Sequence, residues 1–246
     1  MRKPTTTWLA FLALGALGAA TLLALLAPFG WPFELFAHFR PQYAVAALLV
    51  TLVLAGQRRG VAAGIAALLV AWNALPVVQR ASAEAPPVSC EGPAFSVATV
   101  NLQYSNLQRD RFLAWLAGHP ADLIVVQELT NAWAQTLAGS DAHSHRFLLT
   151  REDPYGIGVL SRWPLESSGA IDLAGDGLPS VAGIVDVEGR RIRLLGLHTH
   201  WPVLPEVARM RDAALGGAAG IARDSDLPVI LLGDLNLTPD SPEFTR

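Results

Sequence analysis

The sequence predicts a layered α/β domain with packed sheets, preceded by three transmembrane helices. Two observations predict this architecture. The first eighty residues contain three long apolar stretches, whereas from Ala94 onward short apolar runs alternate with polar residues. Several of these short runs are apolar at every position, which is typical of strands that are covered on both faces. Hydrophobic residues make up 52% of the 246 residues and charged residues only 16%, a more apolar balance than in most soluble domains.

The three apolar stretches favour a membrane anchor. Trp8 to Phe29 contains no charged residue and is long enough to cross a bilayer, which takes roughly 20 residues. A second stretch runs from Phe39 or Pro41 to Gly56, and a third, close to spanning length, from Val61 to Val78. A cleaved signal peptide is the alternative for the first stretch, and a buried hairpin is the alternative for the other two. The length of the first and the near absence of polar residues from the others favour the anchor.

The charge distribution predicts the orientation. Residues 1–80 contain six basic residues and one acidic residue, whereas residues 81–246 contain 12 basic and 20 acidic residues. Arg2 and Lys3 precede the first stretch, and Arg58 and Arg59 separate the second from the third. Because positively charged loops tend to stay in the cytoplasm, we expect a multi-pass protein of the cell (inner) membrane whose C-terminal domain is extracytoplasmic. The acidic balance of that domain disfavours non-specific binding of nucleic acid.

We divide the chain into an anchor at 1–80, a linker at 81–93 and an α/β domain at 94–246. The linker is rich in Pro, Ala, Ser and Glu and has no helical or strand period. In the last part, helical spacing predicts helices over Arg109–Ala117, Asn131–Ala138 and Val207–Ile221. Strands are expected where the short apolar runs occur: Phe95–Val100, Leu123–Val126, Ile157–Leu160, Val181–Val187, Ile192–Leu197 and Val229–Leu232.

Four of these apolar runs end in a group that can bind a metal or handle a proton. The groups are Asn101, Glu128, the His198-Thr199-His200 segment, and Asp234 with Asn236. Each has an ordinary explanation when taken alone, as a turn former, a solvated strand end or a satisfied histidine. Their combination, each at the end of a buried strand, favours a preorganised site of the kind that phosphoryl transfer requires.

These segments resemble the successive motifs of the endonuclease/exonuclease/phosphatase superfamily. The resemblance covers about Phe95 to the C-terminus and rests on five segments: Ala98-Thr99-Val100-Asn101-Leu102, Ala121 to Glu128, Gly158 to Pro164, Thr199-His200-Trp201-Pro202 and Gly233-Asp234-Leu235-Asn236. Together with the three-span anchor, it is similar to the membrane-bound subgroup that includes the teicoplanin-resistance membrane protein of actinomycetes.

The resemblance implies a two-sheet α/β sandwich and a Mg²⁺-dependent hydrolase, with Mn²⁺ as an alternative ion. By position, Glu128 matches the metal-binding glutamate, and Asn101 matches the neighbouring asparagine that helps to place metal and phosphate. Asp234 and Asn236 match the pair that orients the attacking water and holds the phosphate.

Two histidines compete for one further role. By resemblance, His200 matches the histidine that stabilises the pentacovalent transition state, and His198 is the competitor. We prefer His200 because Thr-His followed by a proline-containing loop fits the membrane-bound subgroup better.

The pattern of the superfamily breaks after Asn236. The family ends in a Ser-Asp-His-like motif whose histidine is the general base, and Leu237 to Arg246 contain no histidine. We therefore expect a C-terminally incomplete, truncated domain with an exposed sheet edge, low activity and low stability. A fragment of a longer protein and a truncated gene product both remain open.

Three functions remain in competition. The first is a membrane-anchored, metal-dependent phosphoesterase that hydrolyses phosphate ester, diester or pyrophosphate bonds of a lipid-linked or headgroup substrate beside the lipid bilayer. The second is an extracytoplasmic nuclease, which the acidic balance disfavours. The third is a catalytically dead, membrane-tethered binding protein, which the missing motif would explain. No protein partner, substrate identity or number of metal ions follows from the sequence.

Overall fold

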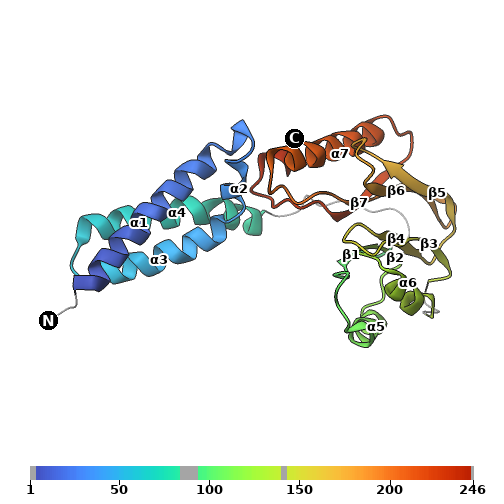
Figure 1. Cartoon of the computed structure of the whole chain (residues 1–246), viewed down its shortest axis with the longest axis horizontal. Helices are drawn as coiled ribbons and strands as arrows, with labels where there is room; N and C mark the ends of the chain where they lie inside the picture. The colour runs from blue at the N-terminus through green and yellow to red at the C-terminus, as the bar shows by residue number, and fades with distance from the viewer. Residues whose placement is uncertain (1–3, 84–93, 140–142, 245–246) are drawn as a thin grey trace. The chain divides into compact units, whose positions relative to one another are not determined.

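The computed structural model describes residues 4–83, 94–139 and 143–244 of the chain (Figure 1). The chain forms two compact units, one of Met1–Ser89 with Leu237–Arg246 and one of Cys90–Asn236. Most of the predicted linker, residues 84–93, lies outside the described residues.

The first unit is helical. Its elements are α1 (Pro4–Leu25), the 3-10 turn η1 (Ala27–Phe29), α2 (Glu34–Ala37), α3 (Arg40–Gly56) and α4 (Gly60–Ser82). Among the described residues, two helices, Thr5–Leu25 and Gly60–Ser82, are long and apolar enough to cross a membrane by length and composition. The helix α3 forms where the sequence predicts it, but its 17 residues fall short of the roughly 20 needed. Two of the three predicted stretches thus have the length and composition of a membrane span.

Small residues and one polar pair hold the helices together. Ala47, Leu54 and Ala66 are fully buried where the helices meet. The buried side chain of Asn73 on α4 donates a hydrogen bond to the hydroxyl of Thr21 on α1 at 3.0 Å. Close packing through small residues and interhelical polar contacts are typical of helices in lipid.

The segment after Asn236 packs on these helices. Asp240 accepts two hydrogen bonds from the Arg80 guanidinium at 3.0 and 2.9 Å. The hydroxyl of Ser241 donates to the buried carboxylate of Glu34 at 2.6 Å, just before the 3-10 turn η2 (Pro242–Phe244). These residues therefore belong to the first compact unit, with the helices.

The second unit consists of two mixed sheets, in the strand orders β1-β2-β4-β3 and β5-β6-β7-β8. β1 pairs parallel with β2 and β7 pairs parallel with β8, while the other pairs are antiparallel. The strands are β1 (Val97–Asn101), β2 (Leu123–Gln127), β3 (His145–Leu149), β4 (Ile157–Ser161), β5 (Leu165–Asp172), β6 (Pro179–Val187), β7 (Arg190–His198) and β8 (Val229–Asp234).

The alternation of side chains along β2 shows why its sequence is apolar throughout. Leu123 and Val125 point to the layer between the sheets, where they pack with Val181 and Val185 of β6. Ile124 and Val126 point to the opposite face. Both faces are covered, as expected for a strand of uniform hydrophobicity.

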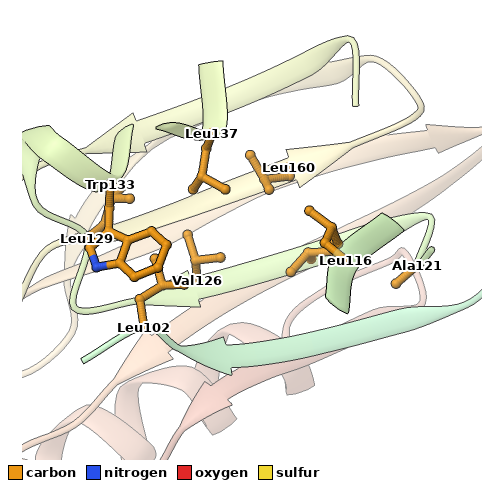
Figure 2. Close-up of a cluster of buried hydrophobic side chains, with 9 residues drawn as sticks. Leu102, Leu116, Ala121, Val126, Leu129, Trp133, Leu137 and Leu160 are labelled. Atoms are coloured by element: carbon orange, nitrogen blue, oxygen red, sulfur yellow. The ribbon is translucent and has the colours of Figure 1, made fainter. Parts of the chain in front are cut away.

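Helices cover the outer faces of the sheets. On the first sheet, α5 (Arg109–Gly118) and α6 (Asn131–Ala138) bury a cluster that includes Leu116, Trp133, Leu137 and Val126, shown in Figure 2. On the second sheet, α7 (Pro205–Arg223) packs Ala218 against Leu195 and Leu197 of β7. This two-sheet arrangement confirms the predicted fold class for the α/β part.

Two strands escaped prediction. The strand β5 reads Leu-Glu-Ser-Ser-Gly-Ala-Ile-Asp, without a clear period of two, and contains a register shift between Glu166 and Gly169. The strand β3, residues His145–Leu149, is partly buried at every position, at the edge of its sheet. Pairing with a neighbour, rather than the local pattern, forms both strands.

Candidate functional site

Parallel pairing brings the predicted residues to two adjacent strand ends. In the first sheet Asn101 is the register partner of Gln127, so Glu128 follows directly beside it. In the second sheet His198 is the register partner of Asp234. Strand β1 of the first sheet contacts β8 of the second, so the two pairs of strand ends lie next to each other.

Glu128 is fixed by hydrogen bonds to both carboxylate oxygens. Asn101 Nδ2 donates to Oε1 at 2.8 Å, and the backbone amide of Tyr104 donates to Oε2 at 2.9 Å. The backbone of Glu128 is in the left-handed region at φ 59°, which is costly for a residue with a Cβ atom. A strained conformation held by its surroundings is common at functional sites.

Asn101 links the two carboxylates. The same Nδ2 also approaches Asp234 Oδ2 at 3.3 Å, while Asn101 Oδ1 accepts from the backbone amide of Gln103 at 2.9 Å. In this orientation the amide group of Asn101 faces Glu128 and Asp234 as a donor.

Gly233 allows Asp234 to reach the site. A Cβ atom at Gly233 would lie 1.9 Å from the carbonyl oxygen of Leu197, so only glycine permits this close approach of β8 to β7. Asp234 Oδ1 then accepts from the backbone amide of Asn236 at 3.0 Å, and Asn236 Nδ2 donates to the Thr199 carbonyl at 2.7 Å. The Gly-Asp-Leu-Asn motif is thus a rigid turn at the end of the strand.

A pocket of about 300 Å³ opens where these side chains meet. Five sequence-predicted residues line it, namely Asn101, Glu128, His198, Asp234 and Asn236. The other lining residues are Pro154, Tyr155, Thr199 and Trp201. His200, the preferred histidine, is not among the described residues that line it. The structure therefore brings together five of the six predicted residues in the pocket, and the sixth, His200, contacts the pocket-lining Tyr155.

His198 lies in this pocket in an almost buried position, 6% exposed. Burial lowers the pKa of its imidazole below the ordinary 6.5. The carboxylates of Asp234 and Glu128 act in the opposite direction and raise this pKa, whereas the neighbouring His200 lowers it slightly. The neutral ring carries one N–H donor and one acceptor nitrogen beside the two carboxylates.

His200 has both ring nitrogens engaged within the protein. Nε2 is 2.9 Å from Asp176 Oδ2, and Nδ1 is 3.2 Å from the Tyr155 hydroxyl. The Tyr155 ring lies edge-on to His200, with centroids 5.3 Å apart, and 5.9 Å from the His198 ring.

The donor set of the pocket fits a hard divalent cation. Two carboxylates, Glu128 and Asp234, converge on one bridging amide, and none of the described residues that line the pocket is Arg or Lys. Mg²⁺ is held in proteins by one or two carboxylates while it keeps several waters. No group of three or more His, Cys, Asp or Glu side chains that could hold a metal ion by themselves occurs among the described residues.

Sequence reasoning missed Tyr155 and Asp176, and it included Trp201 in a motif without predicting that it lines the pocket. Tyr155 precedes the run Ile157–Leu160 and carries no motif of its own. Asp176 lies in the loop between β5 and β6, and β5 itself was not predicted. The only available signal was the position of Tyr155 at the start of a buried strand.

Comparison with known proteins agrees with this architecture. The family model described as "Endonuclease/Exonuclease/phosphatase family" matches residues 98–246. No curated protein matches the chain.

Solved structures share the fold at low identity. Humanized D. rerio TDP2 has a TM-score of 0.53 at 21% identity, covering 61% of this chain and 66% of that one. D. rerio TDP2 complexed with single strand DNA product has a TM-score of 0.52 at 21% identity, covering 60% of this chain and 62% of that one. Sphingomyelinase C from Streptomyces griseocarneus has a TM-score of 0.52 at 21% identity, covering 63% and 68%.

The chain thus spans about two thirds of the length of these structures or slightly less. At this identity the likeness concerns the fold. The matched model covers more than half of the chain, and its residues include all the strand ends described above. The chain belongs to the endonuclease/exonuclease/phosphatase family.

Proposed function

We propose that this protein is a membrane-anchored, Mg²⁺-dependent phosphoesterase that hydrolyses a phosphate ester, diester or pyrophosphate bond of a lipid-linked or headgroup substrate. The single observation that carries the proposal is the convergence of Glu128, Asn101, Asp234 and His198 on one pocket.

In this proposal Glu128 binds the metal ion. Asp234 either helps to balance the positive charge of the ion or orients an attacking water. A bound Mg²⁺ would neutralise charge that develops on the phosphoryl oxygens. Asn101 positions the two carboxylates relative to each other through its amide group. Asn236 keeps Asp234 in place through its backbone amide.

For the histidine that stabilises the transition state we propose His198 rather than His200. His198 lines the pocket beside Asp234, whereas His200 makes two hydrogen bonds to other side chains. A neutral, desolvated imidazole can donate a hydrogen bond to a phosphoryl oxygen without introducing a competing charge.

The loops around the pocket favour an amphipathic substrate over a nucleic acid. Residues 199–205 contain no Arg or Lys, and the loop that carries Pro154 and Tyr155 contains one arginine, Arg151, which is paired with Asp153. Trp201 is 70% exposed although it lines the pocket, and Val203, Leu204 and Leu107 are also exposed. A polyanion would be expected to meet several cationic side chains here, whereas an apolar rim suits a lipid chain.

The proposal is tested by a substrate panel on the full-length protein in detergent, with Glu128→Gln as the key variant. We expect Mg²⁺-dependent release of phosphate from lipid phosphates, and a loss of about 100-fold or more in Glu128→Gln, because the amide cannot supply the metal with a charged ligand. The control is Glu166→Gln on β5, which removes a surface carboxylate that is paired with Arg191 of β7. This change should leave turnover unchanged. Turnover that persists in Glu128→Gln, or faster nicking of plasmid DNA than hydrolysis of lipid phosphate, would contradict the proposal.

A further inference from the structure

Tyr155, which lines the pocket, forms a chain of hydrogen bonds with His200 and Asp176. We propose that Tyr155 is a substrate-contacting residue that donates a hydrogen bond to a phosphoryl oxygen, and that His200 and Asp176 are its positioning residues. This inference rests on the proposed phosphoesterase function.

Asp176 is the rigid base of the chain. Its Oδ1 accepts from the backbone amide of Leu178 at 2.9 Å and its Oδ2 faces His200 Nε2 at 2.9 Å, so both carboxylate oxygens are engaged. Asp172 stabilises the loop that carries Asp176. Its carboxylate accepts hydrogen bonds from the backbone amides of Gly175, Asp176 and Gly177. These backbone hydrogen bonds, led by the one from Gly177, lower the pKa of Asp172.

The direction of the hydrogen bonds follows from Asp176. Because an ionised carboxylate only accepts, Nε2 of His200 carries the proton that is shared with Asp176. Nδ1 then faces the Tyr155 oxygen at 3.2 Å. His200 has no nitrogen left for a ligand, and it acts on the pocket through Tyr155.

Tyr155 is held at two points. Its backbone amide donates to Asp153 Oδ1 at 2.9 Å, and Asp153 is itself paired with Arg151. Its hydroxyl is held by His200. The ring forms part of the pocket wall beside Glu128 and His198. Few rotamers are open to a side chain that is fixed at both ends, so its hydroxyl is preorganised.

The electrostatic surroundings keep this hydroxyl protonated. Burial raises the pKa of Tyr155, and the carboxylates of Asp153, Asp176 and Glu128 raise it further. A phenol is a donor as well as an acceptor. Because Nε2 already holds a proton toward Asp176, Nδ1 donates to the phenol oxygen only in the imidazolium form of His200, as an ion pair with Asp176. In that form the Tyr155 O–H is free to turn toward a phosphoryl oxygen in the pocket.

Kinetics of the full chain in detergent test the inference. A missing donor to the developing charge typically costs about 10²-fold in kcat. We expect a loss of that order in Tyr155→Phe with a small change in KM, and smaller losses in His200→Asn and Asp176→Asn. The double variant Tyr155→Phe/His200→Asn should be no slower than Tyr155→Phe alone, because both changes remove the same contact. Controls are Tyr43→Phe on α3 and His119→Asn at the end of α5.

Binding of orthovanadate, a pentacovalent analogue, supplies a readout that does not depend on turnover. Titration calorimetry with Mg²⁺ present should show about tenfold weaker binding in Tyr155→Phe and unchanged binding in Tyr43→Phe. Unchanged kcat and vanadate affinity in Tyr155→Phe, or losses that multiply in the double variant, would overturn the inference. Tyr155-dependent binding without turnover of any phosphate ester would instead refute the proposed function and retain this contact.

Discussion

At the scale of single residues, the pocket gathers groups whose positions cost stability. Glu128 and Asn236 both have left-handed backbone conformations, at φ 59° and 48°. His198 is nearly buried, and the Thr199 hydroxyl that also lines the pocket has no hydrogen-bond partner among the described residues. Strain and unsatisfied polarity at one place are expected where a ligand completes the interactions.

The burial of His198 predicts a pH dependence of stability. Burial lowers the pKa of His198 in the folded protein below the ordinary 6.5. As the pH falls through about 6.5, the unfolded chain takes up a proton that the folded chain does not, so stability is lost on the acidic side, by at most about 1.4 kcal/mol per pH unit.

We expect urea unfolding of the α/β part of the full chain, followed by near-UV circular dichroism in detergent, to show this slope between pH 7.5 and 5.5. His198→Gln should flatten the slope, because no titrating group is then buried at that position. His119→Asn, which changes an exposed histidine at the end of α5, is the control. Equal slopes in wild type and His198→Gln would show that other groups dominate.

At the scale of elements, the strand register decides which residues meet. The pairings Asn101–Gln127 and His198–Asp234 place four strand ends within reach of one another. The close approach of β8 to β7 at Gly233 is a precondition, because the Leu197 carbonyl occupies the space of a side chain.

Gly233→Ala should therefore reduce both stability and activity. The added methyl group would push β8 from β7 and displace Asp234, at a cost of about 1–3 kcal/mol or more. Gly216→Ala in α7 is the matched control, because nothing lies within 4 Å of a Cβ atom there. Helix propensity alone should then stabilise the chain by up to about 1 kcal/mol. Urea unfolding and turnover of both variants would check this, and an unaffected Gly233→Ala would show that β8 adjusts freely.

At the scale of the whole molecule, the chain combines an apolar helical unit with an α/β unit of the endonuclease/exonuclease/phosphatase family. Residues 1–80 are basic overall and residues 81–246 acidic. Exposed apolar side chains such as Leu49, Val61 and Leu68 cover the helices, and lipid is the environment that would shield them. We therefore keep membrane anchoring and the extracytoplasmic position of the α/β unit as predictions.

A pair of reporter fusions tests the orientation. A reporter that is active only in the cytoplasm should be inactive when fused after residue 90, because the positive charge of Arg58 and Arg59 retains that turn inside. The same reporter inserted after residue 58 should be active. Activity after residue 90 would place the α/β unit in the cytoplasm, and release of the full chain by an alkaline carbonate wash would reject the anchor altogether.

Local sequence determined most elements of this protein. Runs such as Leu123–Val126 are apolar at every position because both faces of the strand are covered, so the fold class and the strand ends that carry Asn101, Glu128 and Asp234 could be predicted. The eight-residue strand β5 could not, because its pairing with β6 and not its own pattern forms it.

Only the tertiary structure decided how the two histidines divide their roles. His198 and His200 are two residues apart and equally suited to phosphate chemistry by type. The register of β7 with β8 places His198 opposite Asp234, and the β5–β6 loop supplies Asp176 as the partner of His200. These contacts join residues that are distant in the chain, and a local pattern carries no information about which distant side chain will stand opposite.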